Sequence, residues 1–283
     1  MRKNNFLTLF CITISVLIAS CNLLRPNSKK NTFVLIQTNM GNIKLKLYNG
    51  TPKTRDNFIK LVKSHFYDST LFHRVIQSFM IQGGDPSSKK AKQGVELGNA
   101  DVGYTIPAEF NQAYFHKRGA LAMARESDDV NPTKASSGCQ FYIVQGRIFS
   151  NSDIDQLQAK RNQPIKRKIF SDFIRKPENE NLKEEFMLYE QENNIDSLKL
   201  LTQKVQPQLD SIFKITPHYE YDAEQRKAYT TIGGAPHLDG NYTVFGEVVE
   251  GMDVVDKIAA LPVDANSRPI TDVRILKVTI VKK

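Results

Sequence analysis

Residues 67–84 read YDSTLFHRVIQSFMIQGG, and this stretch decides how the chain folds. Across it, apolar residues alternate at the spacing of two that is typical of β-strands. One arginine, Arg74, and one glutamine, Gln82, stand within that pattern, and the pair at positions 83 and 84 is Gly-Gly, which favours a turn. The stretch therefore predicts short strands that present Arg74 and Gln82 among apolar side chains.

The N-terminal residues are typical of an exported protein. A basic start is followed by an apolar stretch of about 13 residues, which suits a secretory signal and is short for a membrane span. Residues 18–21, Ile-Ala-Ser-Cys, resemble a bacterial lipobox. We expect residues 1–20 to be a lipoprotein signal peptide, with cleavage before Cys21 and a lipid on its sulfur. A plain signal peptide cut near Ala19 is the alternative. Residues 21–31 are polar and predict a flexible tether.

Cysteine content and charge limit the remaining chemistry. Cys11 lies in the predicted signal peptide and Cys21 would carry lipid, so the mature domain retains Cys139 alone and cannot form an internal disulfide. The formal net charge is +9, but no nucleic-acid motif is visible, and we expect no nucleic-acid partner. The five histidines lack the spacing of a metal site, so we expect neither a metal nor another cofactor.

Most of the chain predicts short strands. Residues 32–48 predict two of them, because apolar and polar residues alternate on both sides of a turn at residues 39–42. Further strand-like runs follow at Thr105–Pro107, Ala120–Ala124, Gln140–Gln145, Thr243–Val249 and Val273–Val281. Two helices are indicated among them, at residues 51–65, with Thr51 as the N-cap, and at residues 253–260. Many short strands with two helices predict a closed antiparallel barrel.

Residues 149–230 break this pattern. Their apolar residues recur every three or four positions, as at Ile165, Ile169 and Phe173, and their many charges nearly balance. Because such apolar stripes need burial, we interpret the segment as a helical insertion rather than a disordered loop. We expect a separable helical layer, which a short loop could replace without loss of the barrel.

The decisive stretch closely resembles the signature of the cyclophilin family of peptidyl-prolyl isomerases. Three further blocks stand in the order found in that family: Arg118–Arg125, Gly138–Ile143 and Leu238–Gly246. The resemblance implies a mainly β fold, a closed eight-stranded antiparallel cyclophilin-like barrel with two capping helices. Its two halves would be residues 32–148 and 231–283, with the helical insertion 149–230 between them.

The resemblance also implies roles for individual residues. Arg74 would be the catalytic arginine, and Gln82 would hydrogen-bond the substrate backbone as its catalytic partner. Ala124 and Arg125 would form the edge that holds the peptide by backbone groups. The other substrate-binding positions are Phe79, Met80, Tyr142 and Leu238 in the proline pocket, and His73, Gln140, His237 and Tyr242 around the groove.

Some of these positions depart from the usual residues of the family. Tyr142 stands where phenylalanine is common, and its hydroxyl needs a partner or water. His237 stands where eukaryotic members often have tryptophan, and Tyr242 replaces a histidine at the rim of the groove. Phe79 and Met80 are neighbours in a strand-like run, so we expect at least one of them to be partly structural.

The residues suit a reaction that needs no cofactor. Rotation about a peptide bond is slow because amide resonance must be lost, a barrier of ~18–20 kcal/mol. A guanidinium aimed at the prolyl nitrogen would stabilise the twisted amide more than the planar one. The sequence therefore predicts a peptidyl-prolyl cis-trans isomerase for exported or unfolded proteins, a monomer held in the cell envelope by lipid. The alternative is a non-catalytic binding or chaperone module that acts through the insertion.

Overall fold

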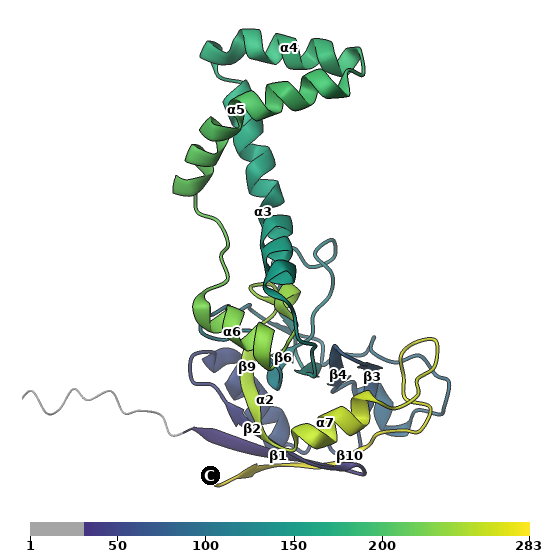
Figure 1. Cartoon of the computed structure of the whole chain (residues 1–283). Helices are drawn as coiled ribbons and strands as arrows, with labels where there is room; N and C mark the ends of the chain where they lie inside the picture. Colours follow the sequence, from purple (N-terminus) through teal and green to yellow (C-terminus); the bar gives the residue numbers. More distant parts are fainter. Residues whose placement is uncertain (1–30) are drawn as a thin grey trace, which may run out of the picture.

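The computed structural model describes residues 31–283. The predicted signal peptide, the predicted lipid site at Cys21 and nearly all of the predicted tether lie outside the described residues. Within the described range, no helix has the length and apolar character required to span a bilayer. The described chain forms a body built on a β-sheet and a helical arm that projects from it (Figure 1).

The body contains one eight-stranded sheet in which all neighbouring strands are antiparallel. The strands lie in the order β10-β1-β2-β9-β6-β8-β4-β3. Their bounds are β1 Thr32–Thr38, β2 Gly41–Leu47, β3 Phe72–Ile76, β4 Met80–Gly83, β6 Ala120–Met123, β8 Phe141–Val144, β9 Val244–Glu250 and β10 Ile275–Val281. Each overlaps a run predicted from alternation. A separate pair joins β5 (Thr105–Ile106) to β7 (Ser136–Ser137), and β7 was not predicted.

The sheet curls, and its two edge strands are β10 and β3. Among the described residues, an isolated bridge between Leu71 and Arg274 lies between these edges. Backbone hydrogen bonds from Ser69 to Ile275 (2.8 Å) and from Phe72 to Val273 (2.9 Å) flank it. Within residues 31–283 these contacts do not extend into a continuous ladder between the two edges. The predicted closed barrel is therefore observed as an eight-stranded half-barrel.

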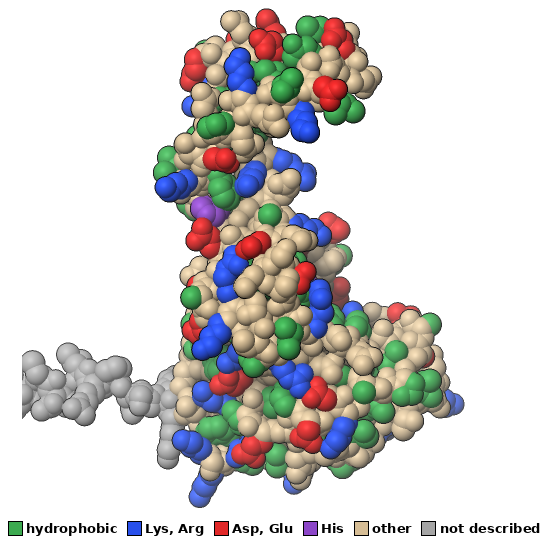
Figure 2. Space-filling view, in the orientation of Figure 1, with side chains coloured by type: hydrophobic (Ala, Val, Ile, Leu, Met, Phe, Trp, Pro, Cys, Tyr) green, Lys and Arg blue, Asp and Glu red, His purple; other side chains and the backbone are tan. Residues whose placement is uncertain are grey.

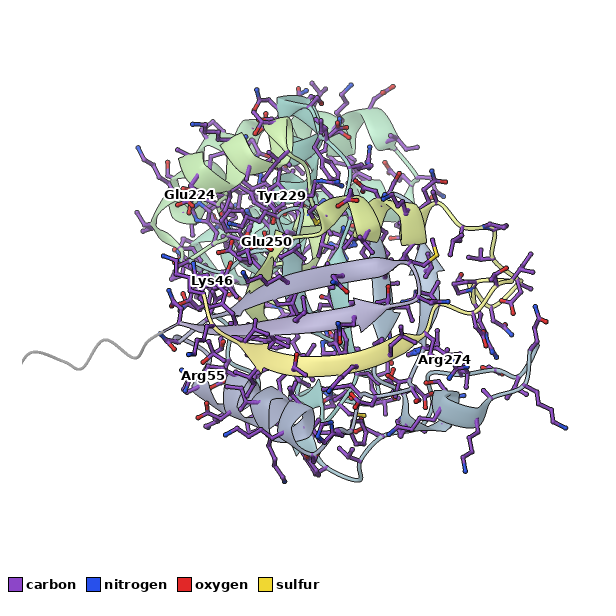
Figure 3. All side chains as sticks on the ribbon, turned by 90° about the horizontal axis from the view of Figure 1, so that it is seen from below. Lys46, Arg55, Glu224, Tyr229, Glu250 and Arg274 are labelled. Carbon is purple, nitrogen blue, oxygen red and sulfur yellow. The ribbon has the colours of Figure 1, made fainter. Side chains whose placement is uncertain are left out.

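The two predicted capping helices are present. They are α2 (Pro52–Lys63) and α7 (Met252–Ala259), and α2 packs against β10 whereas α7 packs against β2, β3 and β4. Seen from below, β1, β2 and β10 lie side by side, with α2 and α7 on opposite sides of them (Figure 3). The apolar stripe of each helix supplies buried residues to the main core, such as Phe58 from α2 and Val255 from α7.

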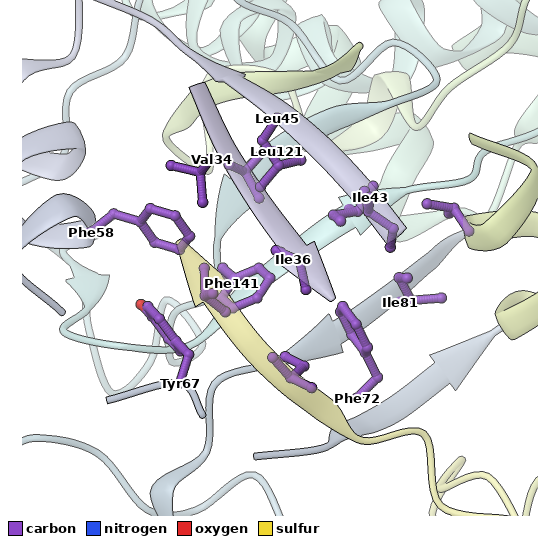
Figure 4. Packing of buried hydrophobic residues seen from close by; sticks show 14 of the residues in the cluster. Val34, Ile36, Ile43, Leu45, Phe58, Tyr67, Phe72, Ile81, Leu121 and Phe141 are labelled. Carbon is purple, nitrogen blue, oxygen red and sulfur yellow. The ribbon is translucent and has the colours of Figure 1, made fainter. Parts of the chain in front are cut away.

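Aromatic rings fill the centre of this core. The ring centroid of Phe58 lies 5.1 Å from that of Tyr67 and 5.5 Å from that of Phe141 (Figure 4). The hydroxyl of Tyr67 donates to the Cys139 carbonyl at 3.1 Å, so the ring brings no unpaired polar atom into the core. Burying one such side chain contributes roughly 1.5–3 kcal/mol relative to leaving it exposed. The rings thereby join α2 to the strands beneath it.

The first turn of α2 is capped by a residue that the sequence did not indicate. Thr51 precedes the helix as predicted, but its side chain makes no capping hydrogen bond. Instead, the Glu109 carboxylate accepts the backbone N–H of Lys53 at 3.0 Å and that of Thr54 at 2.8 Å. A carboxylate suits this place because the first N–H groups of a helix have no intrahelical partner and carry partial positive charge.

The predicted helical segment contains four helices. They are α3 (Asn151–Ile174), α4 (Glu180–Gln191), α5 (Ile195–Ile215) and α6 (Ala223–Thr231). A capping box starts α3, because the side chains of Ser150 and Asp153 each accept the other's backbone N–H. The predicted apolar stripes meet between α3 and α5, where Ile169, Phe173, Val205 and Leu209 are buried together. The prediction of packed helices is confirmed.

The base of the arm is part of the body's packing. Ile154 of α3 and Tyr229 of α6 are fully buried in one cluster with Phe115 of the body. Above this cluster, the Asn162 side chain donates to the Tyr219 carbonyl at 2.8 Å and accepts the Tyr219 N–H at 3.0 Å. We infer that the removable part of the arm is shorter than residues 149–230, and that it begins and ends beside the Asn162–Tyr219 pair.

Charges are mixed over the visible surface. On the face shown in Figure 2, Lys and Arg side chains are interspersed with Asp and Glu from the body to the tip of the arm. Many of them form exposed ion pairs, such as Lys168 with Asp172 and Lys257 with Asp253. Exposed pairs of this kind contribute little to stability, so the packing described above carries the fold.

We expect a variant with residues 163–218 replaced by a short Gly-Ser loop to remain folded, because Asn162 and Tyr219 already hold the two ends together. Its Tm should stay close to that of the wild type. Replacing residues 149–230 instead should lower Tm markedly, since losing one large buried aromatic alone costs about 3–5 kcal/mol. Calorimetry of the three proteins tests this, and equal Tm values for the two shortened variants would contradict it.

Candidate functional site

A pocket of about 340 Å³ opens on the outer side of the sheet, over β3, β4, β6 and β8. The sequence-predicted site residues gather here, with the exceptions of Gln140 and His237. Those that line the pocket are His73, Arg74, Phe79, Met80, Gln82, Ala124, Arg125, Tyr142, Leu238 and Tyr242. The sequence did not indicate the other lining residues, which are Leu97, Gly98, Asn99 and Asn266.

Strand register places the central residues in one row. Arg74 of β3 pairs with Gln82 of β4, which pairs with Tyr142 of β8, which pairs with Ala122 of β6. Residues that are paired across antiparallel strands point to the same face of the sheet. The row therefore crosses four neighbouring strands. It places the Arg74 cation beside the Gln82 amide, the amide beside the Tyr142 ring, and the ring beside Ala122.

Apolar side chains form one end of the pocket. Met80, Tyr142 and Leu238 are buried in a second apolar cluster that is distinct from the main core, and Phe79 packs against them half-buried. Although it does not line the pocket, His237 packs its ring against that of Phe79 at a centroid distance of 5.4 Å. Met80 is 1% exposed, so it is largely structural, whereas Phe79 presents more surface. This agrees with the expectation that one of these neighbours is partly structural.

Hydrogen bonds orient the polar side chains at the other end of the pocket. Arg74 is exposed, and its Nη1 donates to Gln82 Oε1 at 3.2 Å. Gln82 Nε2 in turn donates to Gln140 Oε1 at 3.1 Å. Buried Gln140 donates to the carbonyls of Gly98 and Ala100 at 2.8 and 2.9 Å. Gln140 therefore fixes the amide of Gln82 from behind rather than lining the pocket itself.

The edge predicted to hold a peptide offers fewer available backbone groups than expected. The N–H of Ala124 already donates to the Gln140 carbonyl at 2.9 Å, and the Ala124 carbonyl accepts from Ser137 at 2.8 Å. Among residues 31–283, no hydrogen bond to the backbone of Arg125 is found. Backbone groups for a bound peptide are thus offered by Arg125, whose guanidinium packs 4.6 Å from the centroid of the Tyr242 ring.

The hydroxyl of Tyr142 finds its partner in His116, which the sequence did not indicate. His116 Nε2 lies 2.9 Å from this hydroxyl, and His116 Nδ1 lies 2.8 Å from Asp239 Oδ1. The hydroxyl of Tyr229 donates to the other Asp239 oxygen at 2.5 Å. The extra hydroxyl at Tyr142 was the one available signal that a buried partner would be needed.

Two titratable groups near the pocket are shifted by burial. Burial lowers the pKa of His73 to about 4, against the opposing effect of the Asp85 charge. Burial also raises the pKa of the Cys139 thiol to about 12, with Asp101 adding to the effect. Both groups are therefore uncharged at neutral pH, which leaves Arg74 and Arg125 as the charges that line the pocket.

Comparison with known proteins agrees with this geometry. The sequence model of the family described as "Cyclophilin type peptidyl-prolyl cis-trans isomerase/CLD" matches residues 33–167 and 220–280, well over half of the chain. The chain belongs to the cyclophilin-type peptidyl-prolyl cis-trans isomerase family. The unmatched residues between these ranges, 168–219, form the outer part of the arm; they begin shortly after Asn162 and end at Tyr219.

Individual relatives of this cyclophilin support the assignment. A Staphylococcus haemolyticus protein, provisionally named a peptidyl-prolyl cis-trans isomerase, is 28% identical over 252 residues, 88% of this chain and 91% of that protein. A Staphylococcus aureus protein with the same name is 29% identical over 248 residues, 87% of this chain and 90% of that protein. The crystal structure of a Cryptosporidium parvum cyclophilin-type isomerase shares the fold, with a TM-score of 0.51 at 19% identity, covering 90% of this chain and 99% of that one.

We expect the buried His73 to make folding stability depend on pH. Because its folded-state pKa is about 4 and its ordinary value is 6.5, the unfolded chain binds the proton first as the pH falls. Stability should be full above pH 6.5 and should decrease toward pH 4, by up to about 3 kcal/mol at 1.36 kcal/mol per pKa unit.

Urea unfolding at pH 7 and pH 4.5 tests this expectation. His73→Asn should lose less stability on acidification than the wild type. The surface variant His65→Asn is the matched control and should behave as the wild type does. An equal loss in all three proteins would show that His73 does not carry the effect.

Proposed function

We propose that this pocket catalyses cis-trans isomerisation of X-Pro bonds in exported or unfolded proteins. One observation carries the proposal: the cross-strand row places the guanidinium of Arg74 beside the apolar end of the pocket and orients it through Gln82. An apolar cup beside a fixed cation suits a substrate with an apolar ring and a nitrogen that gains electron density during the reaction. A prolyl residue fits both requirements.

The residues divide the task between binding and electrostatics. Phe79, Met80, Tyr142 and Leu238 would hold the pyrrolidine ring still while the preceding carbonyl swings around the C–N bond. As the amide twists, it loses resonance and the prolyl nitrogen gains a lone pair. Arg74 donates a hydrogen bond toward this nitrogen and so stabilises the twisted state more than the planar state, which lowers the barrier.

Backbone recognition would keep the substrate extended across the pocket. Gln82 hydrogen-bonds the peptide backbone next to Arg74, and Gln140 holds its amide in a fixed orientation. The free backbone groups of Arg125 bind the substrate on the opposite side of the pocket. These contacts would keep the X-Pro bond beside Arg74 while the preceding carbonyl swings.

We expect the wild-type protein to accelerate X-Pro isomerisation in a short peptide without any cofactor. Arg74→Ala should lower kcat/KM by two or more orders of magnitude, since one preorganised donor is worth roughly 2.7–4 kcal/mol. Arg74→Lys should restore only part of the rate, because an ammonium lacks the planar set of donors.

A coupled assay of cis-to-trans conversion measures these rates. Arg175→Ala on the exposed end of α3 is the matched control and should leave the rate unchanged. Arg74 is exposed, so its loss should not lower Tm. Activity of Arg74→Ala equal to that of the wild type would refute the assigned role.

A second function is favoured by two apolar grooves on the arm. One of about 300 Å³ lies between α3 and α5 beside Phe170 and Phe213, and another of about 560 Å³ lies beside Ile165 and Ile212. Two cations and one carboxylate border each groove: Lys166, Arg167 and Asp210 on the first, and Lys168, Lys176 and Asp172 on the second, where Lys168 pairs with Asp172. We propose that the arm holds apolar segments of unfolded proteins that are flanked by acidic residues.

The variant that lacks residues 163–218 separates the two functions. It should keep the peptide activity of the wild type, because the pocket residues lie outside the removed segment. It should suppress aggregation of a proline-free unfolded protein less well than the wild type does. Equal suppression by both proteins would show that the arm does not hold unfolded chains.

We also propose that the mature protein is a monomer anchored in the cell envelope by lipid on Cys21. The lipobox-like residues 18–21 support this anchor. Because β1 begins at Thr32, about ten residues would separate the lipid from the body. This would place the pocket near the membrane surface, where exported chains emerge.

Metabolic labelling with an alkyne fatty acid tests the anchor. The wild-type protein should be labelled and should fractionate with membranes, whereas Cys21→Ser should be unlabelled. Cys139→Ser is the control, because this buried thiol should not affect labelling. An unlabelled wild type would contradict the proposal.

The predicted closure of the barrel is retained as part of the same proposal. The segment before β3 and the start of β10 would complete the circle of strands. The bridge between Leu71 and Arg274 and the hydrogen bonds of Ser69 and Phe72 support this arrangement. Slow amide exchange at Phe72 would be expected if the two edges stay joined in solution.

A further inference from the structure

A buried hydrogen-bond network connects the last helix of the arm segment to the pocket. Tyr229 of α6 donates to Asp239 Oδ2 at 2.5 Å, and Asp239 Oδ1 lies 2.8 Å from His116 Nδ1. His116 Nε2 lies 2.9 Å from the hydroxyl of Tyr142, which forms the pocket wall. All four side chains are less than 5% exposed. The network thus links the stretch from Tyr229 to Asp239 with His116 and Tyr142, which lie far from that stretch in the sequence.

The chemistry of the groups fixes the direction of each hydrogen bond. Burial raises the pKa of Tyr229 and that of Tyr142, so both hydroxyls stay protonated and can donate. A carboxylate only accepts, so the proton between His116 and Asp239 sits on Nδ1. In a ring that carries this one proton, the remaining nitrogen of His116, Nε2, accepts from Tyr142. Asp239 also accepts the backbone N–H of His116 at 2.8 Å, which anchors the ring's position further.

This order leaves the Tyr142 ring little freedom. Its hydroxyl is tied to His116, and its edge packs against Tyr242 at a centroid distance of 5.9 Å. Leu238 lines the same apolar end of the pocket and is adjacent in sequence to Asp239, so hydrogen bonds to this carboxylate also restrain the backbone that carries Leu238. A buried network that satisfies all its members holds its groups in one arrangement, whereas a missing member leaves a costly unpaired group.

We propose that Tyr229, Asp239 and His116 are positioning residues for the isomerase, holding Tyr142 and Leu238 in the arrangement that fits the proline ring. The inference rests on the proposed function of the pocket and adds a residue from α6 to its support. It also gives the segment 220–230 a role in the reaction that is separate from any role of the outer arm. Because α6 lies beyond Tyr219, the variant lacking residues 163–218 retains the network.

Variants that each lack one tyrosine hydroxyl test the inference in the full-length protein. Tyr229→Phe removes one donor and keeps the ring that packs in the cluster with Phe115. We expect kcat on a short X-Pro peptide to fall about tenfold while KM changes less than about twofold, the size typical for one member of a coupled network. Tyr219→Phe makes the same chemical change at the base of the arm outside the network and should leave both constants unchanged.

The Tyr142→Phe background distinguishes positioning from general damage to the fold. Because Tyr229 acts in part through the Tyr142 hydroxyl, Tyr229→Phe should lower kcat by a smaller factor once that hydroxyl is gone. An equal loss in both backgrounds would overturn the inference. A second result would also overturn the inference: Arg74→Ala abolishes the activity, but Tyr229→Phe leaves it unchanged. That result would leave the proposed function of the pocket intact.

A spectroscopic measurement on the wild type covers the case in which Tyr229→Phe fails to fold. The ¹⁵N shifts of His116 should show a neutral ring with the proton on Nδ1 and a bare, hydrogen-bonded Nε2. Its Nδ1 proton should exchange slowly with water. A ring with the proton on Nε2 would reverse the order of donors and overturn the proposed network.

Discussion

The alternation of side chains along paired strands is the constraint on which the rest of the structure depends. Along β4 and β8, residues that face the site alternate with residues that face the core, so a shift by one residue would exchange the two sets. On β3 the register shifts between Phe72 and Arg74, and His73 lines the pocket together with Arg74. Arg74, Gln82, Tyr142 and Ala122 stand in one row because three strand pairings share this register. Their sequence neighbours lie in the main core: Val75, Ile81, Phe141, Ile143, Leu121 and Met123.

Rigidity of the site comes from polar groups that lie behind it. Gln140 fixes Gln82 through the carbonyls of the loop at residues 98–100, and His116 fixes Tyr142 through Asp239. Neither partner lines the pocket, yet each limits a residue that does. A catalyst that works by electrostatic preorganisation needs such support, because a mobile donor would have to be reordered in every reaction cycle.

Local patterns predicted the strands of the main sheet and both capping helices, because each of these features is written within a few neighbouring positions. The grouping of the site residues was instead implied by the resemblance to the cyclophilin family. Contacts between distant segments were not predictable in this way. Glu109 caps α2 from more than 50 residues away, and Asp239 lies 123 residues from His116. The boundary between the arm and the body was not predictable from local patterns either. The helical spacing of residues 149–230 does not reveal that Ile154 and Tyr229 are buried against the body.

The central claim is that the X-Pro peptide bond of an extended segment rotates while the segment is bound between Arg74 and Arg125. Two-dimensional exchange NMR on a short X-Pro peptide with a catalytic amount of protein measures this rotation directly. The account predicts exchange peaks between the cis and trans forms, together with a shift of the Arg125 backbone amide on titration with the peptide. Exchange no faster than in free peptide, with shifts confined to the arm, would contradict it.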